Sequence, residues 1–276
     1  MGSSRRGCLI DNRARERNIR APVRVLLMQR SEKGANVSRR LSLSLALVGL
    51  LLASIGCRTS APKVRRTISR DKKVELGRAE STQVSVAMGI GKLSISGGAE
   101  GALDARFDYE IPEWKPVVTY EVEKGLGRLA VKQPDSKVGA KTDVRYDWRL
   151  RLSGKVPTDL VIEMGTGSVN LDTRGVNLRR LKVAVAVGEG RIDLSDVTSS
   201  LNAKIESGVG ELELLVPSDV GVMVRADGIG HVQAPDLTKG DEGWTNAAWG
   251  KSKASVNVDV SGIGEVRIET VARQTI

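Results

Sequence analysis

The chain has 276 residues, 40% of them hydrophobic and 3% aromatic, and a formal net charge of +10. This hydrophobic content is ample for a buried core, so the composition argues against a largely disordered chain. Residues 1–56 carry 11 of the 43 Lys and Arg but only 3 of the 33 Asp and Glu, which leaves residues 57–276 nearly neutral. Nucleic-acid binding draws on clustered basic side chains of a folded surface, so this distribution argues against nucleic acid as a partner.

The beginning of the chain has the features of an export signal. Residues 1–27 are rich in arginine and show no periodic pattern, and we predict that they are an upstream extension. In residues 28–56, Arg39 and Arg40 precede an uncharged and mostly apolar run, residues 41–55. Fifteen residues are too few to span the ~30 Å hydrocarbon core of a bilayer comfortably, so residues 28–56 are predicted to be a cleaved signal peptide.

This segment ends in the residues ASIGC, with Cys57 as the last of them, and it resembles the lipobox of bacterial lipoproteins. The resemblance implies that the signal is cut before Cys57, which becomes acylated, so that membrane lipid is a partner of the chain. Because Cys57 is the only cysteine after Cys8, the exported body can form no internal disulfide, which fits lipidation. An ordinary signal peptide with an incidental Cys57 is the alternative. Arg58 in place of Asp after the cysteine implies the outer membrane, if the cell has one.

A basic tether and a β domain follow the cysteine. Residues 57–73 hold seven basic residues against one acid, and we predict a tether that lies near anionic headgroups. The domain is predicted to occupy residues 74–276, outside the cytoplasm and anchored to the cell envelope.

The domain repeats a Gly-x-Gly unit seven times. Apolar residues follow the first glycine of each unit at the fourth and sixth positions, and a spacing of two is typical of a half-buried strand. Each unit is therefore predicted to be a strand, a glycine bend and a second strand. One unit holds Gly125 and Gly127, and the structural glycines of the others are Gly89, Gly91, Gly165, Gly167, Gly188, Gly190, Gly208, Gly210, Gly228, Gly230, Gly262 and Gly264.

The spacing of the units predicts the fold class. A period near 20 residues in the middle of the domain suits stacked coils, and the larger gaps are interpreted as insertions. We therefore predict an all-β fold, a repetitive parallel β-solenoid-like stack with Gly-x-Gly bends, while an antiparallel β-sandwich stays open as the alternative. In the last two units the upstream apolar pairs, Val222 with Val224 and Val256 with Val258, are displaced by one residue. Such a slip requires a bulge or an altered bend.

Three segments carry a resemblance to a known family. They are VSVAMGIGKLSISGGAEGALDARFDYE, WKPVVTYEVEKGLGRLAVKQP and WRLRLSGKVPTDLVIEMGTGSVNLDTRGVNLRRLKVAVAVGEGRIDL. They resemble the toast-rack (DUF2154/DUF4097-like) β domain and are similar to the C-terminal domain of LiaF-type cell-wall-active antibiotic response proteins. The resemblance covers about residues 74–268. It implies a β-rich domain with an envelope role and, by analogy with LiaF-type proteins, a part in a stress response. The chain departs from them by having a lipid anchor in place of several membrane-spanning helices.

The sequence offers little for catalysis, so we predict no catalytic residues, no metal site and no cofactor. The Gly-x-Gly units lack the third glycine and the helix of a dinucleotide-binding fingerprint. His231 is the only histidine, so a His-based metal cluster, a Ser-His-Asp triad or a Cys-His pair has no further histidine to draw on. Asp135, Asp143 and Asp147 could pair as in glycoside hydrolysis, so a polysaccharide-active enzyme stays an alternative.

Two tryptophans mark a candidate binding loop. Trp244 and Trp249 lie in the insertion 236–254, where they either contact a partner or cover the open end of the stack. Trp114 and Trp148, which flank another insertion, allow the same two interpretations. We predict a non-catalytic scaffold for binding or adhesion with an envelope protein or glycan as partner. Self-association through open β edges, as in a structural surface protein, is a further alternative.

Overall fold

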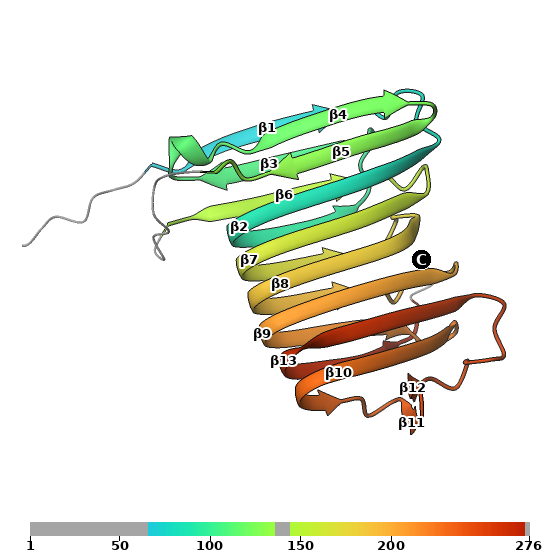
Figure 1. Cartoon of the computed structure of the whole chain (residues 1–276). Helices are drawn as coiled ribbons and strands as arrows, with labels where there is room; N and C mark the ends of the chain where they lie inside the picture. The colour runs from blue at the N-terminus through green and yellow to red at the C-terminus, as the bar shows by residue number, and fades with distance from the viewer. Residues whose placement is uncertain (1–65, 136–143, 274–276) are drawn as a thin grey trace, which may run out of the picture. The chain divides into compact units, whose positions relative to one another are not determined.

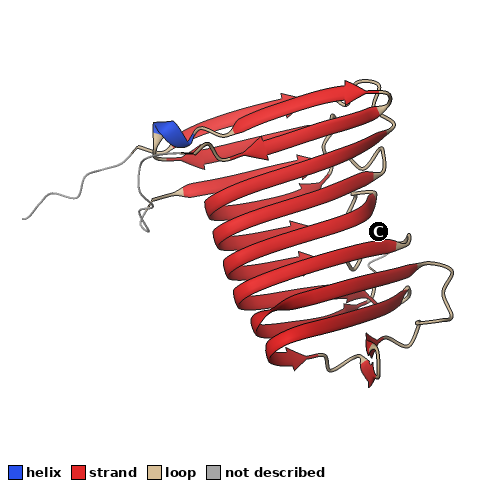
Figure 2. Ribbon diagram, viewed as in Figure 1, coloured by secondary structure: helices blue, strands red, loops and turns tan. Residues whose placement is uncertain are grey.

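The computed structural model describes residues 66–135 and 144–273. They form thirteen strands and one short 3-10 helix (Figures 1 and 2). The predicted extension, the signal peptide and Cys57 lie outside the described residues. The elements in chain order are β1 (Ile68–Val74), β2 (Ser81–Gly97), β3 (Leu103–Tyr109), η1 (Pro112–Trp114), β4 (Val117–Glu123), β5 (Leu126–Lys132), β6 (Tyr146–Leu152), β7 (Thr158–Asp172), β8 (Leu178–Asp193), β9 (Leu201–Pro217), β10 (Gly221–Gln233), β11 (Thr238–Gly240), β12 (Gly243–Thr245) and β13 (Ser255–Val271).

Six long strands make the body of the fold. They pair in parallel in the order β2-β7-β8-β9-β13-β10, and each bends in its middle and returns in a second layer (Figure 1). We call the halves before the bend the front layer and the halves after it the back layer. The bends lie along one edge of the stack, which we call the bend edge. The predicted all-β parallel stack is confirmed, and the antiparallel sandwich is wrong for these six strands.

The strands that continue the stack beyond β2 are shorter and belong to one layer each. β5 pairs with the front half of β2 and forms an antiparallel hairpin with β4, whereas β6, β3 and β1 extend the back layer. Gly125, with a φ of 80°, lies in the turn of that hairpin. The unit of Gly125 and Gly127 is therefore no bend of the stack, and the prediction that all seven units are bends was wrong. The predicted tether is also too long, since residues 68–73 form most of β1.

The last strand in the sequence is not the last strand of the stack. β13 lies between β9 and β10, and the chain crosses over through β11 and β12 to reach that place. The displaced apolar pairs have the predicted consequence. The register between β13 and β9 shifts between Gly262 and Ile263, because β9 has one extra residue, Gly208, at this point. The expected bulge is confirmed.

The core lies between the two layers. In the front layer one row of register partners points inward on seven adjacent strands, and all of its side chains are buried. The row consists of Leu129, Val84, Leu160, Leu181, Ala203, Val258 and Val224. Beside β2, the separate short strands β5 and β6 take the place of one bent strand, and η1 covers the bend edge there. Trp114 packs there edge-on against Tyr146, whose hydroxyl donates a hydrogen bond to the Trp114 carbonyl at 2.5 Å. Burial of these aromatic rings stabilises an end that no bend holds together.

Glycine occupies one register position at every bend. We call these six glycines the glycine ladder. In the order of the stack they are Gly91, Gly167, Gly188, Gly210, Gly264 and Gly230. At Gly188 the φ is 139°, and a Cβ would lie 1.8 Å from the carbonyl oxygen of Gly167. Only glycine permits neighbouring bends to approach this closely. In five of these units the second glycine of Gly-x-Gly belongs to the glycine ladder. In the unit of Gly188 and Gly190 the first glycine, Gly188, belongs to it instead.

Candidate functional site

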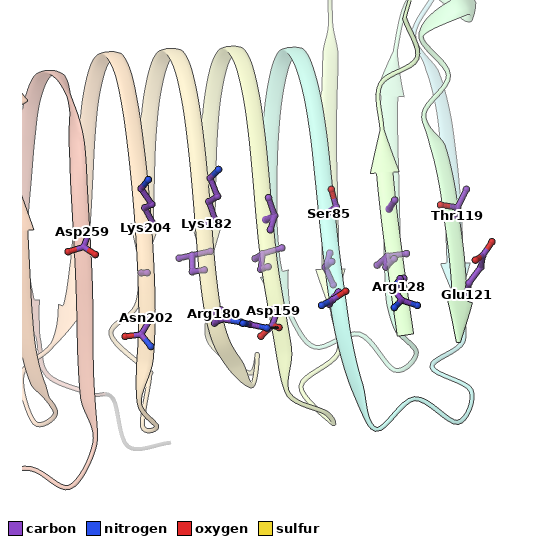
Figure 3. A pocket seen from close by; sticks show the side chains of 18 residues that line it. Ser85, Thr119, Glu121, Arg128, Asp159, Arg180, Lys182, Asn202, Lys204 and Asp259 are labelled. Atoms are coloured by element: carbon purple, nitrogen blue, oxygen red, sulfur yellow. Dashed lines mark hydrogen bonds and ion pairs between the residues drawn. The ribbon is translucent and has the colours of Figure 1, made fainter. Parts of the chain in front are cut away.

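A groove runs over the outer face of the front layer. Its floor consists of small side chains on three adjacent strands, Ala130 on β5, Ser85 on β2 and Val161 on β7, which are register partners. The groove has a volume of about 810 Å³. Its other lining residues are Gln83, Val84, Thr119, Glu121, Arg128, Leu129, Asp159, Leu160, Arg180, Leu181, Lys182, Asn202, Ala203, Lys204 and Asp259 (Figure 3).

The hollow follows from the order of side-chain sizes across the sheet. Neighbouring strands lie about 4.8 Å apart, so three small residues in a row leave a wide strip without long side chains. On one side β4 supplies Thr119 and Glu121, and on the other side β8 and β9 supply Lys182 and Lys204. The rigid ladder of backbone hydrogen bonds holds both walls in place, so the groove is a fixed feature of the sheet.

One end of the groove carries an ion pair built on a second bulge. The register between β7 and β8 shifts after Thr158, which leaves Arg179 without a register partner. Arg179 donates two hydrogen bonds of 2.9 Å each to the Asp159 carboxylate, and Arg180 also contacts that carboxylate. The hydrogen bonds from Arg179 lower the pKa of Asp159 to about 2 although burial opposes the shift. Asp159 is therefore ionised at neutral pH and unsuited to donate a proton.

Two lysines form the basic wall of the groove. Lys182 and Lys204 are register partners on β8 and β9, and their side chains run alongside each other toward the bends (Figure 3). The Lys204 ammonium lies 2.8 Å from the Glu206 carboxylate, whose hydrogen bond raises the pKa of Lys204. Among the described residues, Lys182 forms no salt bridge within 4.0 Å. The wall thus has a basic row next to acidic side chains.

A second hollow continues the groove toward the bend edge. It also measures about 810 Å³ and shares Lys182 with the first. Its lining includes the small residues Ala87 and Ala184 together with the acid Glu163. The front layer therefore presents a trough along the strands, with small residues on its floor and charges of both signs on its rim.

The predicted binding loop lies at the other end of the stack. Trp244 is half-buried in β12 and is the register partner of Val224, and the Lys239 ammonium lies 5.0 Å from the centre of its ring. Trp249 is also half-buried, in the following turn. Both tryptophans belong to a segment that covers the front half of the terminal strand β10, which matches the interpretation as a cap. Neither lines the groove.

Asn246 holds this cap in place. Its buried amide accepts a hydrogen bond from the Val222 backbone N–H at 3.0 Å and donates to the carbonyls of Pro217 and Val220 at 3.0 and 2.7 Å. The other two tryptophans, Trp114 and Trp148, are buried in the core and are not available to a partner.

Of the three acids weighed for glycoside hydrolysis, the two that the structure describes lie in different layers. Asp135 lines the second hollow of the front layer, whereas Asp147 lies in the back layer and forms an ion pair of 2.8 Å with Arg145. Asp143 lies outside the described residues. His231 is in β10 beside Glu265. In the part of the chain that the structure describes, no three His, Cys, Asp or Glu side chains are arranged to hold a metal ion. None of the helices in that part is long and apolar enough to cross a membrane.

Sequence reasoning did not find the groove. Its floor combines Ser85, Ala130 and Val161, which are far apart in the sequence and become neighbours only because β2 lies between β5 and β7. The bulge at one end of the groove did have a signal in the sequence. Arg179 and Arg180 are two polar residues between Leu178 and Leu181, and this break in the alternation indicates one extra residue in the strand.

The family profile and one solved structure agree with this architecture. The family profile described as the N-terminal domain of toast_rack, DUF2154, matches residues 63–215. A solved structure of a "putative cell adhesion protein" from Clostridium sporogenes covers 75% of this chain and 100% of its own, with 33% identity and a TM-score of 0.72. A "putative adhesin" from Bacteroides fragilis covers 74% of this chain and 97% of its own, with 12% identity and a TM-score of 0.33. No protein of curated function matches the sequence.

Proposed function

The chain belongs to the toast-rack family, and on that premise we propose that its β domain is a non-catalytic scaffold for binding or adhesion at the bacterial cell envelope. The groove of the front layer is the proposed binding surface. The observation that carries the proposal is the strip of small side chains, Ala130, Ser85 and Val161, between two rigid charged walls. The name of the Clostridium sporogenes protein supports adhesion as the purpose of that surface.

The chemistry of the groove suits an extended polar chain, such as a glycan or a peptide segment of an envelope protein. The floor is mostly apolar and the rim offers donors and acceptors, for example the amide of Asn202 and the guanidinium of Arg128. Such a surface combines apolar contact with a few orienting polar groups, as ligand sites usually do. Asp159 is held as an ionised partner of two arginines, which favours a structural role over acid catalysis.

The test fills the groove without disturbing the core. Ser85→Trp places a large side chain on the floor, and Ser94→Trp places the same side chain on the back face of the same strand. We expect Ser85→Trp to reduce binding of the labelled protein to isolated bacterial envelopes at least tenfold, while Ser94→Trp retains wild-type affinity. Equal binding by both variants, with wild-type folding by circular dichroism, would contradict the assignment of the groove.

We further propose that Cys57 carries the lipid anchor, with residues 58–67 as the tether. The lipobox-like ASIGC segment and the single cysteine of the exported chain support this proposal. The intact mass of the membrane-fraction protein should correspond to a chain that begins at an acylated Cys57, and Cys57→Ala should leave the protein unacylated. A mature chain cut elsewhere would overturn the anchor. A part in an envelope stress response is proposed only from the LiaF-type resemblance, and deletion of the gene should then change the response to cell-wall antibiotics.

Self-association is a second candidate function, because strand edges are open at the ends of the stack. Among residues 66–135 and 144–273, the cap pairs with Met223 and Val224 of β10 and accepts hydrogen bonds from Gly221 and Val222, so residues 225–233 of that strand have no outer strand partner. Unpaired strand edges are templates for pairing with another chain. Sedimentation velocity at increasing concentration should then show oligomers, and a monomer at all concentrations would dismiss this candidate.

A further inference from the structure

Apolar side chains form a column at the apex of three adjacent bends. Val187, Val209 and Ile263 are register partners on β8, β9 and β13, and each directly precedes a ladder glycine. Their exposed fractions are 47%, 55% and 53%, and they belong to the small group of large hydrophobic residues that the fold exposes. We call these three residues the bend ridge. Contiguous exposed apolar side chains mark interaction sites more often than single ones do. The three half-exposed β-branched residues of the bend ridge therefore indicate that this edge contacts a partner.

The chain enters the domain at the same edge. Ile68, the first residue of β1, is the register partner of Tyr109, which pairs with Tyr146. Tyr146 in turn lies beside Gly91, the first glycine of the ladder, because the next residues Lys92 and Asp147 are register partners. Strand β1 therefore begins at the bend edge and runs away from it (Figure 1).

The distance from the predicted anchor limits where a lipid surface can lie. Ten residues, 58–67, separate Cys57 from Ile68, and ten extended residues span at most about 35 Å. The stack order places β8 five strands and β13 seven strands from β1, which is about 24 and 34 Å at the usual strand spacing. A tether attached at one end of the bend edge can thus span the edge as far as the bend ridge.

We propose that the bend edge faces the lipid bilayer and that the bend ridge contacts its surface. This inference rests on the lipid anchor at Cys57 that forms part of the proposed function. A second copy of the chain fits the ridge less well, since stable protein interfaces bury about 800 Å² on each partner and three side chains supply much less. A chain already held by its lipid needs only enough contact to select one orientation, because the anchor keeps the ridge at a high local concentration near the membrane.

Charges beside the bend ridge limit how deeply this edge can enter the bilayer. A hollow at the bends contains both signs, with Lys92 and Arg145 together with the acids Asp147 and Glu189, and Arg145 pairs with Asp147 at 2.8 Å. On the three strands of the bend ridge, Glu189, Glu211 and Glu265 follow the ridge residues by two positions and form a row in the back layer. Carboxylates are costly to place in hydrocarbon, so this acidic row restricts contact to the ridge at the membrane surface. The groove of the front layer then opens parallel to the membrane and stays accessible.

The experiment measures which edge of the anchored protein lies near lipid. Because the chain after Cys57 has no other cysteine, Val209→Cys in the acylated full chain can be labelled with an environment-sensitive fluorophore. Ser199→Cys is the matched control, since Ser199 is exposed in the turn before the same strand, at the edge opposite the bends. Both proteins are placed in phosphatidylcholine nanodiscs that contain a headgroup nitroxide, after intact mass has established acylation of Cys57.

We expect the nitroxide to quench the label at residue 209 at least twofold more than the label at residue 199. Adding Val187→Ser and Ile263→Ser to the Val209→Cys protein should remove most of that difference. Equal quenching at the two positions in an acylated protein would overturn the inference and leave the proposed scaffold function intact. A mass without acylation would overturn the anchor and this inference together, whereas loss of groove binding would affect neither.

Discussion

Replacing a single glycine of the ladder should separate a steric requirement from a merely frequent residue. Gly188→Ala adds a Cβ that would lie 1.8 Å from the carbonyl oxygen of Gly167 and 2.9 Å from its carbonyl carbon. The backbone at Gly188 has a φ of 139°, a region that costs other residues about 1–3 kcal/mol. Moving β7 and β8 apart to relieve the clash costs about 1–3 kcal/mol more. We therefore expect the free energy of unfolding to fall by about 2–6 kcal/mol.

Gly190, two residues further along, is the matched control. A Cβ at Gly190 would meet only the tip of the Leu212 side chain, at 3.1 Å, and the φ is not in the left-handed region. Leucine can move its end group, so Gly190→Ala should change the free energy of unfolding by less than about 1 kcal/mol. Urea titrations followed by far-ultraviolet circular dichroism measure both variants. Similar losses in the two proteins, or a loss below about 1 kcal/mol for Gly188→Ala, would refute the steric account of the ladder.

Three further predictions concern the ion pair, the aromatic end and the cap. The pKa of Asp159 is about 2, below its ordinary 3.8, so its contribution to stability is complete above pH 4 and is lost as the pH falls toward 2. Asp159→Asn should therefore flatten the dependence of the urea midpoint on pH between 4 and 2, and an unchanged slope would contradict the ion pair. Tyr146→Phe removes the hydrogen bond to the Trp114 carbonyl and should lower the free energy of unfolding by about 1–2 kcal/mol in urea titrations. An unchanged free energy of unfolding would contradict the contribution of this hydrogen bond. Asn246→Ala removes three buried hydrogen bonds and should speed amide exchange in β11 and β12 at least tenfold, while β7 and β8 keep their protection.

Much of the architecture was predictable because its two determinants are local. Alternating apolar residues specify strands, and the glycine at each bend reports the close approach of neighbouring backbones. The Gly-x-Gly pattern misled at the unit of Gly125 and Gly127, because a hairpin turn can show the same pattern. Gly125 lies in a hairpin turn with a φ of 80°, and the spacing alone does not distinguish such a turn from a bend.

The order of the last strands could not be derived from the residues. The pairs Val222 with Val224 and Val256 with Val258 share one slip, which makes β10 and β13 neighbours without a bulge between them. Both orders, β9-β10-β13 and β9-β13-β10, satisfy that condition. Only the crossover through β11 and β12 selects the second, and its geometry depends on contacts distant in sequence.

The groove escaped prediction for a related reason. Its floor requires three small outward residues on neighbouring strands, and the neighbours of β2 are β5 and β7 rather than β1 and β3. The alternation of a strand identifies outward positions but not the residues beside them on the sheet. Trp244, by contrast, attracted attention because tryptophan is rare in this chain, yet it serves to cover the strand end.

Amide hydrogen exchange of the protein with and without fragments of bacterial envelope locates the binding surface most directly. The proposed function predicts slower exchange in residues 83–87, 128–132 and 159–163, which surround the groove floor, and unchanged exchange in residues 92–96 of the back layer. Protection confined to the back layer or to the cap around Trp244, with the groove segments unchanged, would contradict the claim that this toast-rack domain binds through its front face.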